Sequence, residues 1–583
     1  MKRYHRLLST LLTLCSLIII SHNACAHSSS SLAVIKPAMA CGQLVGQKLP
    51  GIDTTMSITG AKVVTQDNKT FCQVTASLSP DIGVEVALPQ QQWTQRILQV
   101  GCGGLCGSIN LSLSNANGCL PATQGQFVVA ATNMGHSGSM MDASWALDPQ
   151  KRQDFAYRAN HLTAQFTKAL TRAYYGQPQK YAYFMGCSDG GREALMEAQR
   201  YPDDFNGITA GAPAAYFTVQ NSFYHGWNVV ANQRADGSAI LLKNRLALLH
   251  QTVLEHCPTE SGVKDGVLAN PFACHISRHW LKTCAANTRD KSDCFTEEEV
   301  GVIEKLYQGA KDTSGHQFAV GGLIIGSELR WPLPDTAQGT SPSAMMALPA
   351  LQYVLTVDGK KNDITLAQFG FDQANFQQLA KLAPLYNATD TNLKPYADAG
   401  GKLILWHGLA DDSINPTGTL AYYRGVEQQL GAQRAAKMVK LFLLPGVGHC
   451  GGGEGNDQID LLTPLMAWVE HQQAPQQLLT GKAKATATPQ SLPPAEKPKN
   501  TEEAASVQMH GMQRPSSPVA PAAEAMRATR PVYAYPYIAV YNGKGDPLQA
   551  KNYHAVLGNY PSVLMGEPIR QLIAPNNSSQ ATP

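Results

Sequence analysis

The sequence is poor in charge. Aspartate, glutamate, lysine and arginine make up 15% of the 583 residues, and the formal net charge is only +3. Proteins that bind nucleic acid carry a marked excess of basic residues, so we expect neither a nucleic-acid partner nor a strongly acidic one. The apolar content of 44% is that of an ordinary globular protein.

Several functional signatures are also missing. No Cys-x-x-Cys pair is present, which argues against a zinc site. The glycine-rich segment 101–107 lacks the Lys-Ser/Thr of a phosphate-binding loop, so we do not expect nucleotide binding. No internal repeat is evident, and the apolar segment 7–20 is too short for a convincing membrane span.

The first residues predict the compartment. Basic residues precede the uncharged apolar segment 7–20, and residues 24–26 (Ala-Cys-Ala) offer a small-x-small cleavage site. This order predicts a secretory signal peptide over 1–26 and a secreted or periplasmic protein. A lipoprotein anchored through Cys25 is the alternative, which His22 disfavours because such signals want an apolar residue there.

The cysteine content fits an exported protein. Two of the 13 cysteines lie in the expected signal peptide, and the other 11 indicate a disulfide framework with one odd thiol. These cysteines stand at positions 41, 72, 102, 106, 119, 187, 257, 274, 284, 294 and 450.

Strand and helix patterns alternate through much of the chain, which predicts an α/β fold with a mainly parallel sheet and crossover helices. Shorter alternating runs within 41–100 predict a leading antiparallel part. The pattern stops after about 213, where helices, loops and four closely spaced cysteines are typical of an inserted domain. The strand runs of the parallel part are 96–100, 127–132, 181–185, 207–212, 402–406 and 440–444.

The last part of the chain changes character. Residues 477–529 are rich in Ala, Pro, Lys, Gln and Ser and nearly free of aromatic residues, which predicts a flexible excursion. Aromatic and β-branched residues at 530–541 then suit a strand or an extended segment on the core. The expected division is a core in two parts, a lid, the excursion and a C-terminal segment on the core, at 27–213 with 394–476, 214–393, 477–529 and 530–583 respectively.

Residues 181–200 (YAYFMGCSDGGREALMEAQR) contain the candidate nucleophile, Ser188. A strand, a Gly-Cys-Ser-Asp-Gly turn and a helix follow one another here, which is the context of a G-x-S-x-G nucleophile elbow. The glycines permit a strained backbone, and the helix N-terminus favours developing negative charge. The motif alone is weak, because a Gly/Ser turn can produce it by chance.

A serine nucleophile needs a base, and the base needs an orienting acid. In this fold the acid and then the histidine follow the serine along the chain, each on a loop after a strand. Asp411 comes five residues after the run 402–406, and His449 five after 440–444. Asp412 could replace Asp411, and His449 could instead be an ordinary surface-loop histidine. Since Cys187 precedes the serine and Cys450 follows the histidine, one disulfide could join the two loops.

These residues carry a family resemblance. Cys187-Ser188, Asp411 and His449-Cys450 resemble the paired-cysteine triad of the tannase and feruloyl esterase family, which includes mono(2-hydroxyethyl) terephthalate hydrolases. The resemblance covers about 41–475 and, more weakly, 530–555. It runs through WTQRILQVGCGGLCGSI, FMGCSDGGREALMEAQRYPDDFNGITAGAP, GKLILWHGLADDSI and LFLLPGVGHCGGG.

The resemblance implies an α/β-hydrolase core with a large lid domain inserted after the nucleophile-elbow region. It also implies an oxyanion hole formed by the backbone N–H groups of Gly104 and Asp189. By the same resemblance further disulfides are implied, namely Cys41–Cys72, Cys257–Cys274 and Cys284–Cys294. Cys102, Cys106 and Cys119 then remain, and we expect Cys106 to pair with Cys119.

Family members often carry a calcium loop in the lid. Its counterpart at 257–267 keeps only one of three expected carboxylates, whereas calcium prefers six to eight oxygens with several charges. A calcium site, compensated by Glu260, and a metal-free turn held by a disulfide both stay open. The chemistry itself needs no cofactor. The candidate calcium ligands are Ser261, Val263, Asp265 and Val267.

The sequence therefore predicts a secreted serine esterase for small esters of aromatic acids, of the feruloyl esterase or tannase type, whose substrate is either free or attached to a plant polymer. The aromatic ring is expected between core and lid. Hydrolysis of a terephthalate monoester is one alternative, although no lid arginine that could bind a free carboxylate occurs between Trp331 and Gly401. A catalytically silent secreted binding protein, with the Pro-rich excursion as its contact surface, is the other.

Overall fold

The computed structural model describes residues 32–66, 68–111, 122, 124–318, 320–483 and 526–560. The expected signal peptide, Cys119 and residues 484–525 of the expected excursion lie outside the described residues. From Ala33 onward the chain forms one structural unit. Within the described part, no helix is long and apolar enough to cross a membrane.

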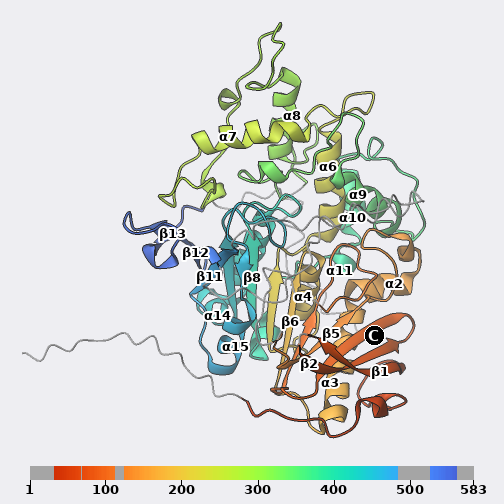
Figure 1. Ribbon diagram of the computed structural model, residues 1–583. Helices are drawn as coiled ribbons and strands as arrows, with labels where there is room; N and C mark the ends of the chain where they lie inside the picture. The colour runs from red at the N-terminus through yellow and green to blue at the C-terminus, as the bar shows by residue number, and fades with distance from the viewer. Residues whose placement is uncertain are drawn as a thin grey trace, which may run out of the picture. The chain divides into compact units, whose positions relative to one another are not determined.

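A nine-stranded mixed sheet lies at the centre of this unit (Figure 1). Its order is β1-β2-β3-β5-β4-β6-β7-β8-β9. The first three strands and β5 pair antiparallel, and from β5 to β9 all neighbours are parallel, as the sequence predicts. The strands are β1 (Met56–Gln66), β2 (Lys69–Leu78), β3 (Ile82–Pro89), β4 (Arg96–Val100), β5 (Phe127–Thr132), β6 (Tyr181–Cys187), β7 (Gly207–Gly211), β8 (Lys402–Gly408) and β9 (Val439–Leu444).

Alternating side chains bury both faces of the sheet. In β6, Ala182 and Phe184 join the core on one face, whereas Tyr183 and Met185 join the core on the other. Residues 181–185 are therefore apolar throughout, as expected of a parallel strand covered on both sides. The first face is covered by α3 (Ala159–Tyr175), α4 (Asp189–Arg200), α13 (Pro416–Leu430) and α14 (Ala432–Met438), and the second by α15 (Leu462–His471).

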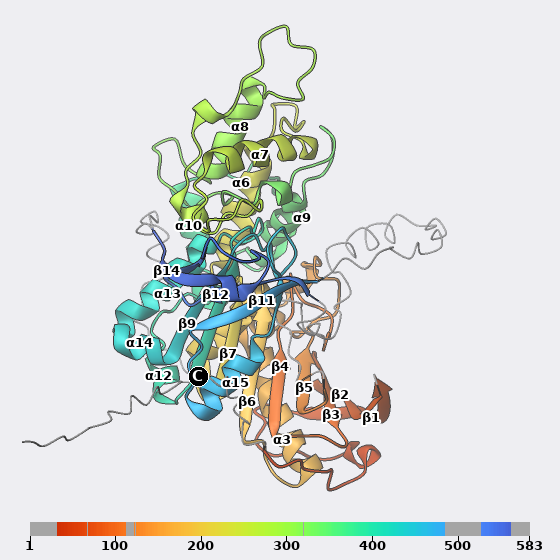
Figure 2. The same ribbon diagram turned by 60° about the vertical axis from the view of Figure 1, so that its left-hand side comes forward.

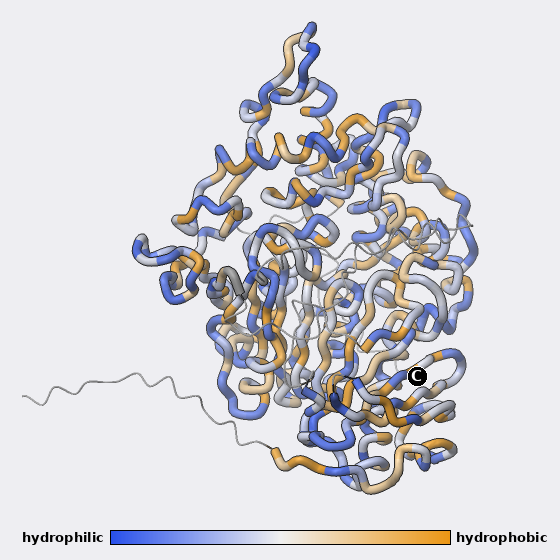
Figure 3. The backbone as a smooth tube through the Cα atoms, in the orientation of Figure 1, coloured by the Kyte–Doolittle hydropathy of each residue, from blue (hydrophilic) through white to orange (hydrophobic). Residues whose placement is uncertain are grey.

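The segment between β7 and β8 is helical and has a core of its own, with Leu249, Ile303 and Trp331 among its buried residues. It corresponds to the lid expected at 214–393. Hydrophobic and hydrophilic stretches alternate along α7 and α8 (Figure 3), as in helices that bury one side. Its helices are α5 (Phe217–Val219), α6 (His225–Val230), α7 (Leu246–His256), α8 (Glu297–Gln308), α9 (Pro342–Pro349), α10 (Gln373–Ala380) and α11 (Ala383–Tyr386), followed by α12 (Lys394–Asp398).

The described part of the C-terminal segment, up to residue 560, packs on the core. β10 (Gln458–Ile459), β11 (Gln477–Ala483) and β12 (Met526–Tyr533) form a small sheet beside β9 (Figure 2). The N–H of Tyr535 donates to the carbonyl of Leu441 in β9 at 2.8 Å. β13 (Tyr537–Tyr541) and β14 (Tyr553–Leu557) form a hairpin.

The boundaries expected for the flexible excursion are wrong at both ends. Residues 477–483 form β11, and residues 526–529 belong to β12, with which β11 pairs antiparallel. In β11, Leu478 and Thr480 are buried while Leu479 between them is exposed. This alternation is that of a strand with one buried face. In the sequence it is short and is hidden by the Ala- and Pro-rich composition of the longer stretch that follows.

Candidate active site

Ser188 lies at a sharp turn between β6 and α4. Its backbone has φ 66° and ψ −122°, a left-handed conformation that costs a non-glycine residue on the order of 1 to 3 kcal/mol and is found mainly at functional sites. A Cβ on Gly186 would clash with the backbone of Gly190. Gly186 is therefore needed for the strand and helix to approach each other this closely, and Gly190 for the glycine loop to pack on the helix, because its Cβ would lie 2.8 Å from the carbonyl oxygen of Cys102.

Asp411 and His449 meet through a short hydrogen bond. His449 Nδ1 lies 2.8 Å from Asp411 Oδ2. The other carboxylate oxygen accepts the N–H groups of Ser413 and Ile414, both at 2.9 Å. The two loops are joined by backbone bonds as well, since the N–H of Ala410 donates to the carbonyl of Val447 at 2.9 Å. Backbone groups thus fix the orientation of the carboxylate that contacts His449.

The electrostatics of this pair suit a general base. Burial alone would raise the pKa of Asp411, but the charge and hydrogen bonds of His449 and His407 outweigh it and hold that pKa well below its usual range. Burial alone would lower the pKa of His449, but the Asp411 carboxylate outweighs burial and raises it. Asp411 therefore remains ionised and stabilises the imidazolium form of His449.

The neighbouring Asp412 has a different environment. Its carboxylate is directed to the lid, where Oδ1 lies 3.5 Å from Arg330 Nε. Burial raises the pKa of Asp412 to about 6, against the opposing charge of Arg330. Of the two aspartates considered from the sequence, Asp411 is the one that contacts His449.

A disulfide between Cys187 and Cys450 brings the elbow and the histidine loop together. The two Cα atoms are 5.9 Å apart, although 263 residues separate them in sequence. Ser188 directly follows Cys187 and His449 directly precedes Cys450, so the bridge holds the candidate nucleophile and the candidate base on adjacent loops. The disulfides Cys41–Cys72, Cys257–Cys274 and Cys284–Cys294 are also formed.

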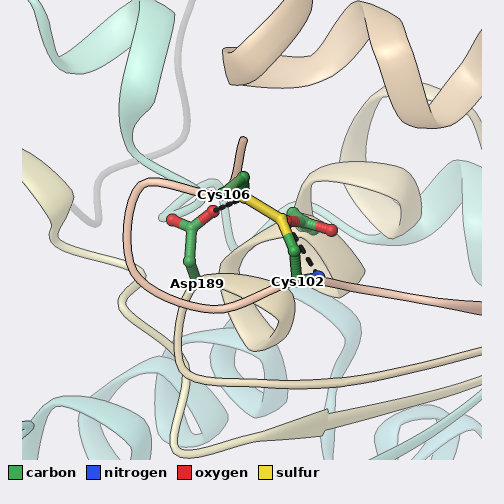
Figure 4. Close-up of side chains that lie close together, drawn as sticks. Cys102, Cys106 and Asp189 are labelled. Carbon is green, nitrogen blue, oxygen red and sulfur yellow. Dashed lines mark hydrogen bonds between the residues drawn. A yellow bond between two sulfur atoms is a disulfide. The ribbon is translucent and has the colours of Figure 1, made fainter. Parts of the chain in front are cut away.

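The expected pairing of Cys106 with Cys119 is wrong. Cys106 pairs with Cys102, four residues earlier (Figure 4). The intervening glycines explain the short link, since Gly104 has φ +61° and lets the chain turn back within four residues. Cys119 lies outside the described residues.

The two expected oxyanion donors come from neighbouring segments. Asp189 is the first residue of α4, so its N–H has no acceptor within the helix. Gly104 lies in the loop after β4, where a Cβ would come within 2.6 Å of the carbonyl oxygen of Met140. The backbone of Gly190 in turn lies against Cys102, since a Cβ added at Gly190 would come within 2.8 Å of the carbonyl oxygen of Cys102. The first turn of α4 and the glycine loop are therefore packed against each other.

Buried charge also fixes the start of α4. The guanidinium of the fully buried Arg192 binds both oxygens of the Asp189 carboxylate, at 2.6 and 3.0 Å. It also donates to the carbonyls of Phe155 and Ala156, at 3.1 and 2.9 Å. Bidentate pairs of this kind are strong and geometrically specific, so Asp189, which follows the candidate nucleophile, has little freedom to move.

The four candidate calcium ligands do not fit that ion. The carboxylate of Asp265 forms an ion pair with Arg530 of β12, and Ser261 Oγ donates to the carbonyl of Val263 at 3.2 Å. The N–H of Val267 donates to Asp265 at 3.3 Å. The only carboxylate among the four candidate ligands is thus already neutralised by a guanidinium.

Another group could in principle bind a metal. Cys102, Cys106, Asp189 and Glu193 place one ligand atom each within 4.8 Å of one another. The disulfide leaves no thiolate at either cysteine, and Arg192 occupies the Asp189 carboxylate. These four residues therefore offer no free thiolate and only one carboxylate, that of Glu193, without a cationic partner, which does not suit a metal ion.

Two residues near the site were missed in the sequence. His407 is buried, with Nε2 3.1 Å from Asp411 Oδ2 and Nδ1 2.7 Å from Thr419 Oγ1. Its signal was its place at the end of the strand that precedes Asp411. Arg330 reaches Asp412 from the lid, and it directly precedes Trp331, at which the stretch without arginine begins.

Comparison with known proteins fits this geometry. Over residues 61–556 the sequence matches the family described as Tannase and feruloyl esterase. The chain belongs to this family. The mono(2-hydroxyethyl) terephthalate hydrolase of Piscinibacter sakaiensis is 28% identical over 483 residues, which cover 70% of this chain and 77% of that protein. Feruloyl esterase B of Aspergillus niger is 28% identical over 451 residues, with coverage of 73% and 82%.

Solved structures show the same fold. An esterase from Aspergillus oryzae superposes with a TM-score of 0.72 at 20% identity, covering 89% of this chain and 100% of that chain. Feruloyl esterase B from Aspergillus oryzae gives a TM-score of 0.69 at 20% identity, with coverage of 88% and 98%. The fold is thus that of an α/β hydrolase, and this member of the tannase and feruloyl esterase family is a carboxylic ester hydrolase.

Proposed function

We propose that the protein is a secreted serine esterase that cleaves esters of aromatic carboxylic acids through an acyl-enzyme. The observation that carries this proposal is the hydrogen bond between His449 and Asp411 at 2.8 Å. The Cys187–Cys450 bridge links the loop of His449 to the turn that carries Ser188. A strained serine at a helix N-terminus, beside an oriented histidine, is an arrangement for nucleophilic catalysis.

In the proposed reaction, Ser188 Oγ attacks the ester carbonyl carbon while His449 Nε2 takes its proton. The oxyanion accepts hydrogen bonds from the N–H groups of Gly104 and Asp189. Collapse of the tetrahedral intermediate breaks the bond to the alcohol, which leaves with the proton from His449. Water, deprotonated by the same histidine, then attacks the acyl-enzyme and releases the acid and Ser188.

The substrate class is proposed from the family and from the position of the site. The relatives include feruloyl esterases and a terephthalate monoester hydrolase, and each of these names contains an aromatic acid. The site lies where core and lid meet, since Tyr224 of the lid donates to the carbonyl of Asp412 at 3.0 Å. Feruloyl and galloyl esters, free or attached to a plant polymer, are the substrates we propose.

Secretion is supported by the disulfides. Five are formed among the described cysteines, and disulfides persist in oxidising compartments such as the periplasm or the exterior of the cell. The basic and apolar start of the sequence is the second support.

Turnover of a small panel of esters tests the proposal. Purified enzyme should hydrolyse methyl ferulate or methyl gallate, and Ser188→Ala should abolish this turnover while circular dichroism shows an unchanged fold. The change removes one hydroxyl from a turn whose backbone is set by the adjacent glycines. Comparable turnover by the variant would contradict the assignment, and absence of ester hydrolysis by the wild type would favour a silent binding protein.

A second candidate substrate is a terephthalate monoester. Arg330 favours this substrate, because its guanidinium lies beside the histidine loop and its contact with Asp412 is long, at 3.5 Å. A substrate carboxylate could therefore compete with Asp412 for the guanidinium. Arg330→Gln should then raise KM for the monoester about 10-fold or more and leave KM for methyl ferulate nearly unchanged. Equal effects on the charged and the neutral ester would exclude this role for Arg330.

A further inference from the structure

The loop after β4 contains a feature that ester hydrolysis does not itself require. Cys102 and Cys106 are joined by a disulfide, with Cα atoms 5.5 Å apart. The bridge closes a small ring around Gly103, Gly104 and Leu105. One of the two proposed oxyanion donors, the N–H of Gly104, is therefore inside a covalently closed ring.

The bridge also faces the segment that carries the other donor (Figure 4). Cys106 Sγ lies 3.7 Å from Asp189 Oδ2. Cys102 Sγ lies 2.8 Å from Oε1 of Glu193, one turn further along α4. The disulfide thus lies between the glycine loop and the first turns of the helix, in contact with both.

The ring has a backbone that needs support. Cys106 has φ +61°, and this conformation costs a non-glycine residue about 1 to 3 kcal/mol unless its surroundings fix it. On one side, the N–H of Leu105 donates to the carbonyl of Met140 at 2.7 Å, and His136 Nε2 lies 2.8 Å from the carbonyl of Leu105. The disulfide supplies the constraint on the opposite side.

The carboxyl group beside the bridge is suited to packing. Burial, followed by the nearby Asp189 carboxylate, raises the pKa of Glu193 to about 8. The group is therefore largely neutral at pH 7 and brings little charge under the loop. Asn160 Nδ2 donates to its Oε2 at 2.9 Å, and the N–H of Cys102 approaches Oε1 at 3.4 Å.

We propose that the Cys102–Cys106 disulfide is a positioning element of the oxyanion hole, which fixes the N–H of Gly104 relative to the N–H of Asp189. This inference rests on the proposed function, because it takes these two groups as the donors. The bridge does not touch the reacting atoms and acts through the backbone of the ring.

The expected size of the effect follows from geometry. Two bonded sulfurs are about 2 Å apart, whereas atoms without a bond keep about 3.5 to 4 Å. Opening the ring therefore widens it by about 1.5 Å between Cys102 and Cys106, and the Gly104 N–H between them shifts. Loss of an entire oxyanion donor lowers kcat by about 10² to 10³, so a displaced donor should lower it by about 10- to 100-fold.

The test compares two disulfides that each close a short loop. Cys102→Ser/Cys106→Ser opens the ring, and Cys284→Ser/Cys294→Ser removes a bridge of 10 residues' separation in the lid. Steady-state kinetics with methyl ferulate should show kcat lowered about 10- to 100-fold in the first variant, with KM changed less than about 3-fold, and kcat retained in the second. Phenylboronic acid, which forms a tetrahedral adduct with a serine nucleophile, should lose affinity for the first variant by a similar factor.

A further variant separates the covalent link from backbone strain. Cys102→Ser/Cys106→Gly places glycine where φ is positive and so keeps the loop foldable without a bridge. It should fold, as judged by circular dichroism, and still show the reduced kcat and the weakened boronate.

Four results bear against the inference. Wild-type kcat in either folded ring variant would overturn it, as would equal losses in the lid variant. Peptide mapping without reduction that finds a free thiol at Cys102 or Cys106 of the native enzyme would overturn it as well. These three leave the proposed function standing, whereas turnover by Ser188→Ala overturns both.

Discussion

Replacing Cys187 and Cys450 together with serine removes the covalent link between the elbow and the histidine loop. The bridge spans 263 residues of sequence, and loop-closure entropy assigns a bridge of that span about 5 to 6 kcal/mol. Measured losses for native disulfides are smaller, about 2 to 5 kcal/mol. We expect the double variant to lose that much of its free energy of unfolding and to remain folded at low temperature.

The folded variant should also turn over substrate more slowly. Ser188 follows β6 and His449 follows β9, and β7 and β8 lie between these strands in the sheet. Without the bridge the two loops can drift apart, and a misplacement of about 1 Å can lower a rate by about 10²-fold. We therefore expect kcat to fall about 10- to 100-fold, with little change in KM, because the drift affects proton transfer more than substrate binding.

The control is the lid disulfide Cys257–Cys274, which spans 17 residues. Its double serine variant should lose about 3 kcal/mol of stability and change KM more than kcat. Peptide mapping without reduction, circular dichroism against temperature and steady-state kinetics decide between the two. A free thiol at Cys187 or Cys450 in the native enzyme, or wild-type kcat in the folded double variant, would refute the reasoning.

The charged groups allow further predictions. Asp411→Asn should lower kcat by about 10⁴-fold and Asp412→Asn by less than about 10-fold, which steady-state kinetics of both variants can check. His449 must be neutral to accept a proton, and its pKa is raised, so kcat/KM should fall on acidification with a midpoint above the usual value of about 6.5; a lower midpoint would contradict this. EDTA should leave the Tm unchanged, because Arg530 pairs with Asp265, the one carboxylate among the four candidate calcium ligands, whereas Arg530→Gln should lower the free energy of unfolding by about 1 kcal/mol.

The central sheet and the elbow were predictable because their signals are local. Residues 403–406 and 441–444 are apolar runs that the fold buries on both faces, and they lie in β8 and β9. The G-x-S-x-G turn is specified by glycines at the two positions where backbones touch. The order of serine, acid and histidine along the chain then follows from the order of the parallel strands.

Features that depend on contacts between distant segments were harder to predict. The partner of Cys106 is set by a left-handed turn at Gly104, which no sequence pattern fixes. His407 carries no motif, and its contact with Asp411 depends on the loop folding back on its own strand. Arg330 reaches the site only because the lid packs over the histidine loop.

Charge balance explains why a family resemblance can extend over a loop while its ligand chemistry differs. A loop with three carboxylates needs a divalent cation to offset their repulsion, whereas the loop 257–267 has a single carboxylate at the corresponding positions, Asp265, and one positive charge is enough. Arg530 supplies that charge from a strand 265 residues away, and its guanidinium also lies 5.1 Å from the ring centroid of Tyr553. This side-chain link adds to a backbone one between the lid loop and the C-terminal segment, since the N–H of Tyr541 donates to the carbonyl of Ser261 at 2.9 Å. Restoring carboxylates to the loop would therefore create a calcium site only if Arg530 were removed as well, since its guanidinium would otherwise compete with the ion for Asp265.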